Sequence, residues 1–155
     1  MIKSCGKVLK LFVSKSGEKN RVNLKSIDLD EGGVIGDKFY AKDNLRSVLL
    51  SSKDSYSLAK DEGIDMEFGL LGENILMDFN PYNLKSGTKL LIGSATLSIS
   101  QNCTICNHLS AVDKRLPKLL KNDRGIFAKV VKSGTINEGD NIQILPQTQD
   151  NLVDN

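Results

Sequence analysis

Residues 89–100 read KLLIGSATLSIS, in which two short apolar segments flank a Gly-Ser pair. Each segment has the length of a short strand, and a two-residue connection that contains glycine is typical of a β-hairpin. The stretch therefore predicts strands at residues 89–92 and 95–100, joined by a tight turn at Gly93 and Ser94. The same alternation of short apolar runs and turn-forming residues continues on both sides of this hairpin.

Short apolar segments bounded by turn-forming residues recur along the whole chain. They predict further strands at residues 7–13, 21–29, 47–50, 126–131 and 141–145, and another that is entered across Gly72 within residues 70–77. Turns are predicted at residues 14–20 and 83–87 and at Gly134. Many short strands separated by turns indicate a mainly β fold with a few short helices, which we expect to be a closed or nearly closed β-barrel.

One regular helix is predicted near the middle of the chain. The serine pair at residues 51–52 can cap a helix that runs to about Glu62, and Gly63 provides its end. Tyr56 and Ala59 are three residues apart and would share the inner face of this helix. We therefore expect the helix to pack these two side chains against the barrel.

The remaining segments are less regular. Residues 106–121 have apolar side chains at helical spacing, with Pro117 among them, which predicts a broken helix or helical loop. Residues 30–45 read as a long, glycine-containing loop, and a loop of this length in a compact domain is usually functional or disordered. We expect a single domain over residues 1–146 and a disordered polar tail over residues 147–155.

Composition and sequence pattern argue against several classes of protein. The chain has 155 residues, a formal net charge of +2, 5% aromatic residues and no tryptophan, a pattern that disfavours nucleic acid as a partner. No apolar run approaches the roughly 20 residues of a membrane-spanning helix, and the N-terminal residues do not resemble a signal peptide. We therefore expect a cytoplasmic protein with reduced thiols and no membrane partner.

Three cysteines are the first candidates for chemistry. Cys103 and Cys106 have the Cys-x-x-Cys spacing of a redox disulfide or of half a zinc site. A zinc site needs about four ligands, which only Cys5 and His108 could complete. Both cysteines could also be small buried hydrophobes, and we favour this interpretation for Cys103. Cys106 therefore remains as the candidate reactive thiol.

A second group of candidates lies around the long loop. Gly36 and Asp37 close its glycine cluster, and Arg46 follows before a predicted strand. Such a loop can present backbone N–H groups and an arginine fork to an anionic ligand. The alternative is a tight turn with a surface ion pair, which contributes little to stability.

Polar residues also interrupt apolar segments at two other places. Glu73 and Asn74 lie between apolar runs, and polar groups that enter a strand need partners, either in a neighbouring loop or in a ligand. Arg124 precedes an apolar strand, where it could lower the pKa of a nearby thiol or could simply extend toward solvent.

Taken together, seven segments between residues 5 and 146 resemble, in order, the MOSC family, named for the C-terminal domain of molybdenum cofactor sulfurases. The segments are GVIGD (33–37), RSVLL (46–50), GLLGENI (69–75), LKSGTKLLIGSA (84–95), CNHL (106–109), RGIFAKV (124–130) and GTINEGD (134–140). No single segment is specific, but their number and order are. The sequence departs from many relatives at Lys38 and Phe39, where those relatives carry a histidine after the Gly-Asp pair.

The resemblance implies a β-barrel like the small barrel domain of pyruvate kinase and a pocket built around one cysteine. Family members bind the molybdenum cofactor (molybdopterin) or carry sulfur on that cysteine, and some stand-alone bacterial members reduce N-hydroxylated bases. Pyridoxal phosphate binding is associated with the family as a whole. On the matching positions, the pocket residues would be Asp37, Arg46, Glu73, Asn74, Cys106 and Arg124.

The resemblance therefore predicts a MOSC-domain protein that binds the molybdenum cofactor or a related ligand, with Cys106 as sulfur carrier or molybdenum ligand. It would be a sulfurtransferase-like protein or a molybdenum-dependent reductase of N-hydroxylated compounds. The predicted catalytic residues are Cys106, Glu73 and Asn74, and the predicted cofactor-binding residues are Gly36, Asp37, Arg46 and Arg124.

Two alternatives remain open at this point. One is a non-enzymatic adaptor that delivers cofactor or sulfur to a molybdenum or metal–sulfur enzyme. The other is a redox protein that uses Cys103 and Cys106 as a dithiol. In each case we expect a monomer or a homodimer.

Overall fold

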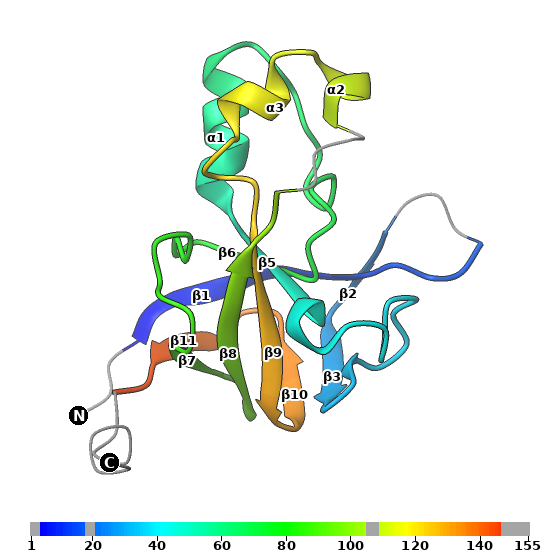
Figure 1. The fold of residues 1–155 in the computed structure, drawn as a ribbon, viewed down its shortest axis with the longest axis vertical. Helices are drawn as coiled ribbons and strands as arrows, with labels where there is room; N and C mark the ends of the chain where they lie inside the picture. Colours follow the sequence, from blue (N-terminus) through cyan, green and yellow to red (C-terminus); the bar gives the residue numbers. More distant parts are fainter. Residues whose placement is uncertain (1–3, 18–20, 105–108, 147–155) are drawn as a thin grey trace.

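The computed structural model describes residues 4–17, 21–104 and 109–146, and it is built mainly of β-strands (Figure 1). Among these residues, seven strands close into a barrel, which confirms the predicted fold class. Their order around the barrel is β11 (Asn141–Ile144), β7 (Lys89–Ile92), β8 (Ala95–Asn102), β9 (Ile126–Lys132), β5 (Val48–Ser52), β6 (Ile75–Met77) and β1 (Ser4–Val13). Pairing of β1 with β11 closes the barrel. The hairpin predicted at residues 89–100 is formed by β7 and β8.

Three details of the predicted secondary structure are wrong, and all concern a second, three-stranded sheet. One is that residues 33–34, within the predicted loop at residues 30–45, form a strand. This sheet has the order β10 (Gly134–Asn137), β3 (Ser26–Asp30) and β4 (Gly33–Val34). The strand predicted at residues 21–29 is divided into β2 (Val22–Leu24), which pairs with β1, and β3, which pairs with β10. Gly134 begins β10 instead of forming a turn.

Close backbone packing explains the glycine at position 134. A β-carbon there would lie 2.4 Å from the backbone carbonyl carbon of Ser94, a distance that no side chain tolerates. Glycine is therefore required by the approach of the two backbones and not by a turn.

The central helix, α1 (Lys53–Asp61), is formed as predicted and joins the parallel strands β5 and β6. Its N-cap is Ser52, whose hydroxyl accepts a hydrogen bond from the backbone N–H of Asp54 at 3.0 Å. Tyr56 and Ala59 are both buried, which confirms the predicted inner face.

The second helical segment is broken, but not where the proline suggested. Helices α2 (Leu109–Val112) and α3 (Leu116–Leu119) are separated at residues 113–115, where Asp113 accepts a hydrogen bond from the backbone N–H of Arg115 at 2.8 Å. Pro117 lies in the first turn of α3, a position that lacks a helical N–H partner and therefore tolerates proline. Residues 106–108 of the predicted segment lie outside the described residues.

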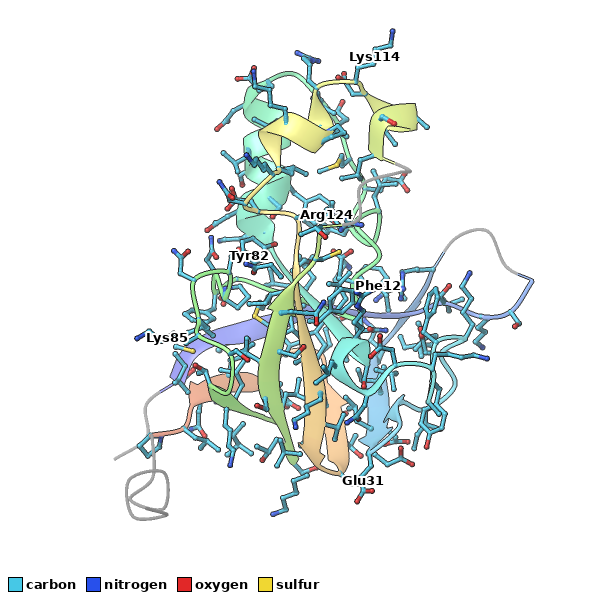
Figure 2. The ribbon with its side chains drawn as sticks, viewed as in Figure 1. Phe12, Glu31, Tyr82, Lys85, Lys114 and Arg124 are labelled. Atoms are coloured by element: carbon cyan, nitrogen blue, oxygen red, sulfur yellow. The ribbon has the colours of Figure 1, made fainter. Side chains whose placement is uncertain are left out.

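Two hydrophobic clusters divide the molecule into a barrel and a helical cap. One fills the barrel, and the other joins Phe12, Leu71 and Leu76 to α1, α2 and α3. Figure 1 shows the three helices together at one end of the barrel, and Figure 2 places Arg124 where they meet it. None of the described helices is long and apolar enough to cross a membrane.

Candidate functional site

A cavity of about 750 Å³ opens beside the barrel end, between the segment at residues 37–49 and the segment at residues 67–74. Four of the predicted site residues line it together, namely Asp37, Arg46, Asn74 and Arg124. Glu73 and Gly36 are not among its lining residues. Cys106 lies outside the described residues.

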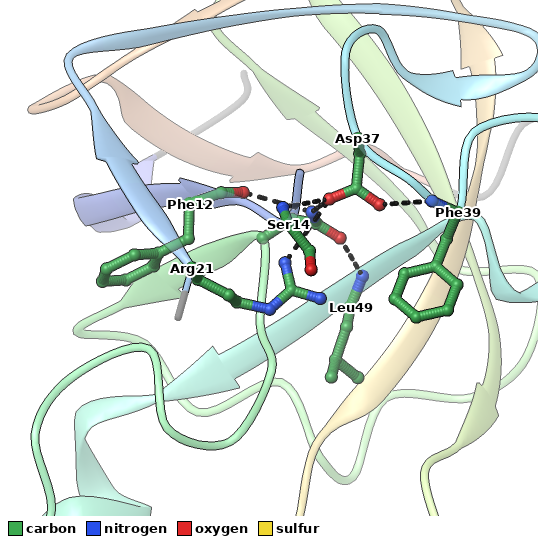
Figure 3. Close-up of polar contacts among 7 residues, drawn as sticks. Phe12, Ser14, Arg21, Asp37, Phe39 and Leu49 are labelled. Carbon is green, nitrogen blue, oxygen red and sulfur yellow. Dashed lines mark hydrogen bonds and ion pairs between the residues drawn. The ribbon is translucent and has the colours of Figure 1, made fainter. Parts of the chain in front are cut away.

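Asp37 fastens the long loop to the end of β1 (Figure 3). Its Oδ1 accepts a hydrogen bond from the backbone N–H of Ser14 at 2.7 Å, and its Oδ2 accepts one from the backbone N–H of Phe39 at 3.0 Å. The guanidinium Nη1 of Arg21 lies 3.5 Å from the same Oδ1. Asp37 therefore fixes the middle of the loop, and the positive φ of Gly36 (94°) provides the turn that precedes Asp37.

Asn74 joins three segments at the cavity wall. Its side-chain Oδ1 accepts a hydrogen bond from the backbone N–H of Leu49 at 3.0 Å, and its Nδ2 donates to the carbonyl of Phe12 at 3.2 Å and to Asp37 Oδ1 at 3.4 Å. Asn74 thus extends the pairing of β6 with both β1 and β5 by one residue, just before β6 begins.

Glu73 is fully buried behind the cavity wall. Its Oε2 accepts hydrogen bonds from Ser51 Oγ at 2.8 Å and from the Tyr56 hydroxyl at 2.6 Å. The Tyr56 oxygen in turn accepts hydrogen bonds from the backbone N–H groups of Gly69 and Leu71, at 3.1 and 3.3 Å. Glu73 therefore orients the hydroxyl that holds one wall of the cavity.

Two buried tyrosines, Tyr56 and Tyr82, make the free energy of unfolding depend on pH in the alkaline range. Burial, followed by the charge of Glu73, raises the pKa of Tyr56 far above its ordinary value, and burial raises the pKa of Tyr82 to about 12. An unfolded tyrosine titrates near pH 10, so above this pH the unfolded chain releases protons that the folded chain keeps. The free energy of unfolding is then expected to fall by about 1.4 kcal/mol per pH unit for each buried tyrosine, with no such loss below pH 10.

Urea unfolding at pH values from about 9 to 11.5 measures this slope. The variant Tyr56→Phe should show a shallower decline than the wild type above pH 10, whatever its stability at neutral pH. Equal slopes for the two proteins would contradict the assignment of Tyr56 as a buried titrating group.

The arginines differ in their exposure. Arg46 is at the rim, where its side chain is 46% exposed and lies 3.7 Å from Asp43 Oδ2. Arg124 is buried, and its Nη1 donates a hydrogen bond to the carbonyl of Leu71 at 2.5 Å. Arg21 also lines the cavity, with a side chain that is only 14% exposed. No motif marks Arg21, so sequence reasoning missed it.

Two aromatic rings that line the cavity are partly open to solvent. Phe39 is 47% exposed and Phe68 is 45% exposed. The ring of Phe68 is held edge-on by Tyr56, with 5.0 Å between centroids and 89° between planes. Exposed aromatic rings in a cavity are suited to stacking on a planar ligand.

Of the residues in the zinc and dithiol predictions, the structure describes Cys5 and Cys103 but not Cys106 or His108. Cys103 is buried and lines the cavity. In the part of the chain that the structure describes, no three His, Cys, Asp or Glu side chains are grouped to hold a metal ion. Cys106 and His108, which the zinc and dithiol alternatives require, lie outside that part, so both alternatives remain predictions.

Comparison with known proteins agrees with this architecture. The family model of the MOSC domain matches residues 37–143. No curated protein matches the chain. Among solved structures, the YuaD protein from Bacillus subtilis is 18% identical with a TM-score of 0.76, and the match covers 96% of this chain and 100% of YuaD.

Two further structures are similar in fold. YiiM from Escherichia coli is 16% identical with a TM-score of 0.66, and the match covers 92% of this chain and 71% of that protein. YiiM from Geobacillus stearothermophilus is 13% identical with a TM-score of 0.67, with coverage of 94% and 76%. At these identities the structural likeness shows the fold alone.

Proposed function

The chain belongs to the MOSC domain family, and from this premise we propose that its cavity binds the molybdenum cofactor or a related pterin ligand. Family membership supports a role connected with this cofactor at the level of the family. The finer proposal is that Cys106 carries sulfur or ligates molybdenum at the cavity. The observation that carries the proposal is the combination of positive charge and exposed aromatic rings in one cavity.

The side chains of the cavity fit a ligand with a planar ring and an anionic group. Its volume of about 750 Å³ lies within the range of small-molecule sites. Among the described residues, five cationic side chains line it against three anionic ones. They are Arg21, Lys38, Lys42, Arg46 and Arg124 against Asp37, Asp43 and Glu67. Phe39 and Phe68 would receive the ring.

Different residues of the cavity would have different roles in binding the ligand. The bound cofactor would supply a redox-active metal. The Cys106 thiolate is soft and nucleophilic, so it could either carry sulfur or coordinate molybdenum. Cys103, three residues earlier in the sequence, lines the cavity. Arginine side chains would bind the anionic group, while Glu73 and Asn74, predicted as catalytic, would keep the walls in place through their buried hydrogen bonds.

Loading of the protein in cells that make the cofactor tests the role of Cys106. Molybdenum is measured by elemental analysis, and the pterin is measured by fluorescence after oxidation. If Cys106 ligates the metal, Cys106→Ser should reduce molybdenum loading about tenfold or more, because even the loss of a residue that only orients a metal ligand lowers metal affinity by that much. The matched control is Cys5→Ser, whose thiol contacts the carbonyl of Ile142 in the barrel wall. Equal loading of the wild type and Cys106→Ser would remove Cys106 as a ligand.

The adaptor alternative is favoured by a separate observation. Three apolar side chains on or just before the segment at residues 37–49 are each about half exposed, namely Ile35, Phe39 and Leu45, at 51%, 47% and 49%. Exposed apolar side chains beside a binding site are typical of contact with a partner protein. A delivery protein would carry the cofactor but show no turnover alone, and turnover by the purified, loaded chain would exclude this role.

A further inference from the structure

The cavity wall at residues 67–72 lies between α1 and β6 and belongs to neither a helix nor a strand. It consists of two successive turns, each closed by one backbone hydrogen bond, at 3.1 and 2.9 Å. Because turns make few backbone hydrogen bonds of their own, the position of this wall depends on contacts from other segments. Phe68, one of the two exposed rings of the cavity, lies at the start of this wall.

The side chain of Phe68 has open space in more than one direction. It lines the cavity and also a neighbouring shallow groove of about 470 Å³. The other residues of this groove are Lys10, Phe12, Asn23, Met66 and Glu67. An aromatic side chain with space around it can change rotamer unless another group holds it. The orientation of the Phe68 ring toward the cavity therefore needs a contact from elsewhere in the protein.

Tyr56, on the inner face of α1, makes that contact. Its ring meets the ring of Phe68 edge-on, at 5.0 Å between centroids and 89° between planes, a favoured arrangement of two aromatic rings. Its hydroxyl oxygen accepts hydrogen bonds from the backbone N–H groups of Gly69 and Leu71, at 3.1 and 3.3 Å. Because the same hydroxyl donates to Glu73 at 2.6 Å, its proton points away from those two N–H groups. Tyr56 therefore holds both the ring and the backbone of the wall.

From these contacts we propose that Tyr56 is a positioning residue for ligand binding, which keeps the Phe68 ring where it can stack on a planar ligand. The inference rests on the proposed function and goes beyond it, because no residue of α1 lines the cavity. The affinity for a planar ligand would then depend on how α1 packs against the wall. The second ring, Phe39, has a different anchor, since its backbone N–H donates to Asp37.

Hydrogen exchange in the ligand-free protein tests whether Tyr56 holds the wall. Tyr56→Phe keeps the ring and removes the hydroxyl, so the amides of Gly69 and Leu71 should exchange about fivefold faster than in the wild type, or more. Tyr82→Phe is the matched control, because the buried Tyr82 hydroxyl also accepts a backbone N–H, at 2.8 Å, but from Ser52 instead of the wall. It should change neither rate. Equal exchange of both amides in Tyr56→Phe and the wild type would overturn the proposal.

Fluorescence titration of the cofactor-free protein with pterin-6-carboxylate, a planar fluorescent pterin, tests the effect on binding. Phe68→Ala should weaken binding about tenfold, and Tyr56→Phe about threefold or more. If Tyr56 acts through Phe68, adding Tyr56→Phe to Phe68→Ala should weaken binding no further. In the Phe39→Ala background, by contrast, Tyr56→Phe should keep its full effect, because the two sites have separate anchors.

The outcomes separate this inference from the proposed function. Wild-type affinity in Tyr56→Phe, or an equal effect of Tyr56→Phe with and without the Phe68 ring, would overturn the inference while pterin binding stands. Absence of binding by the wild type would instead contradict the proposed pterin ligand. The exchange of the Gly69 and Leu71 amides would then decide by itself whether Tyr56 positions the wall.

Discussion

Replacing Glu73 with alanine is expected to lower the free energy of unfolding by about 4 kcal/mol, because two buried hydroxyls lose their acceptor, at about 1–3 kcal/mol for each unsatisfied group. The carboxylate is fully buried and accepts hydrogen bonds from both Ser51 and Tyr56. Without it, two buried hydroxyls lose their acceptor and Arg21 loses a nearby negative charge. Urea denaturation at neutral pH measures the loss.

Two further variants make the interpretation specific. Glu73→Gln keeps an acceptor oxygen for the two hydroxyls and should lose less stability than Glu73→Ala. Glu67→Ala removes an exposed carboxylate from the same segment and should change stability by no more than about 0.5 kcal/mol. An alanine variant at Glu73 that is as stable as the one at Glu67 would show that the buried network does not hold the cavity wall.

The second large effect is expected at Asn74. Asn74→Ala should destabilise the protein by about 3 kcal/mol, because it leaves the buried N–H of Leu49 and the carbonyl of Phe12 without their side-chain partner, at about 1–3 kcal/mol for each unsatisfied group. It also removes a donor to Asp37, so the middle of the long loop should loosen. Denaturant unfolding measures the first effect, and hydrogen exchange of the Phe39 amide measures the second.

The matched control for this substitution is Asn122→Ala. Asn122 is exposed in the segment after α3, where alanine should change stability by no more than about 0.5 kcal/mol. Similar stabilities for Asn74→Ala and Asn122→Ala, or unchanged protection of the Phe39 amide, would contradict the role of Asn74 as the junction of β1, β5 and the loop.

Local patterns were sufficient to predict much of the fold. The hairpin β7–β8 and the helix α1 depend on turn and capping residues that lie within the segments themselves. Gly134 was misread because its glycine is required by Ser94, forty positions earlier in the chain, which no local pattern records. The division of residues 21–29 likewise depends on two different partner strands, β1 and β10.

The site also depends on contacts between distant parts of the chain, which no local sequence pattern records. Four residues from the segments that resemble the family line one cavity, namely Asp37, Arg46, Asn74 and Arg124. Glu73 and Asn74 were predicted together, but neighbouring residues of an extended chain point to opposite sides, so the cavity receives Asn74 and the buried network receives Glu73. Arg21 reaches the cavity only because β2 pairs with β1, and its sequence surroundings contain no comparable motif.

The central claim is that the cavity beside the barrel end holds a molybdenum–pterin ligand. Anomalous diffraction at the molybdenum absorption edge, from crystals of protein loaded in cells, tests this most directly because it locates the metal atom itself. Binding at this site predicts one molybdenum peak in the cavity, with pterin density between Phe39 and Phe68. A molybdenum peak elsewhere on the molecule, with an empty cavity, would contradict it.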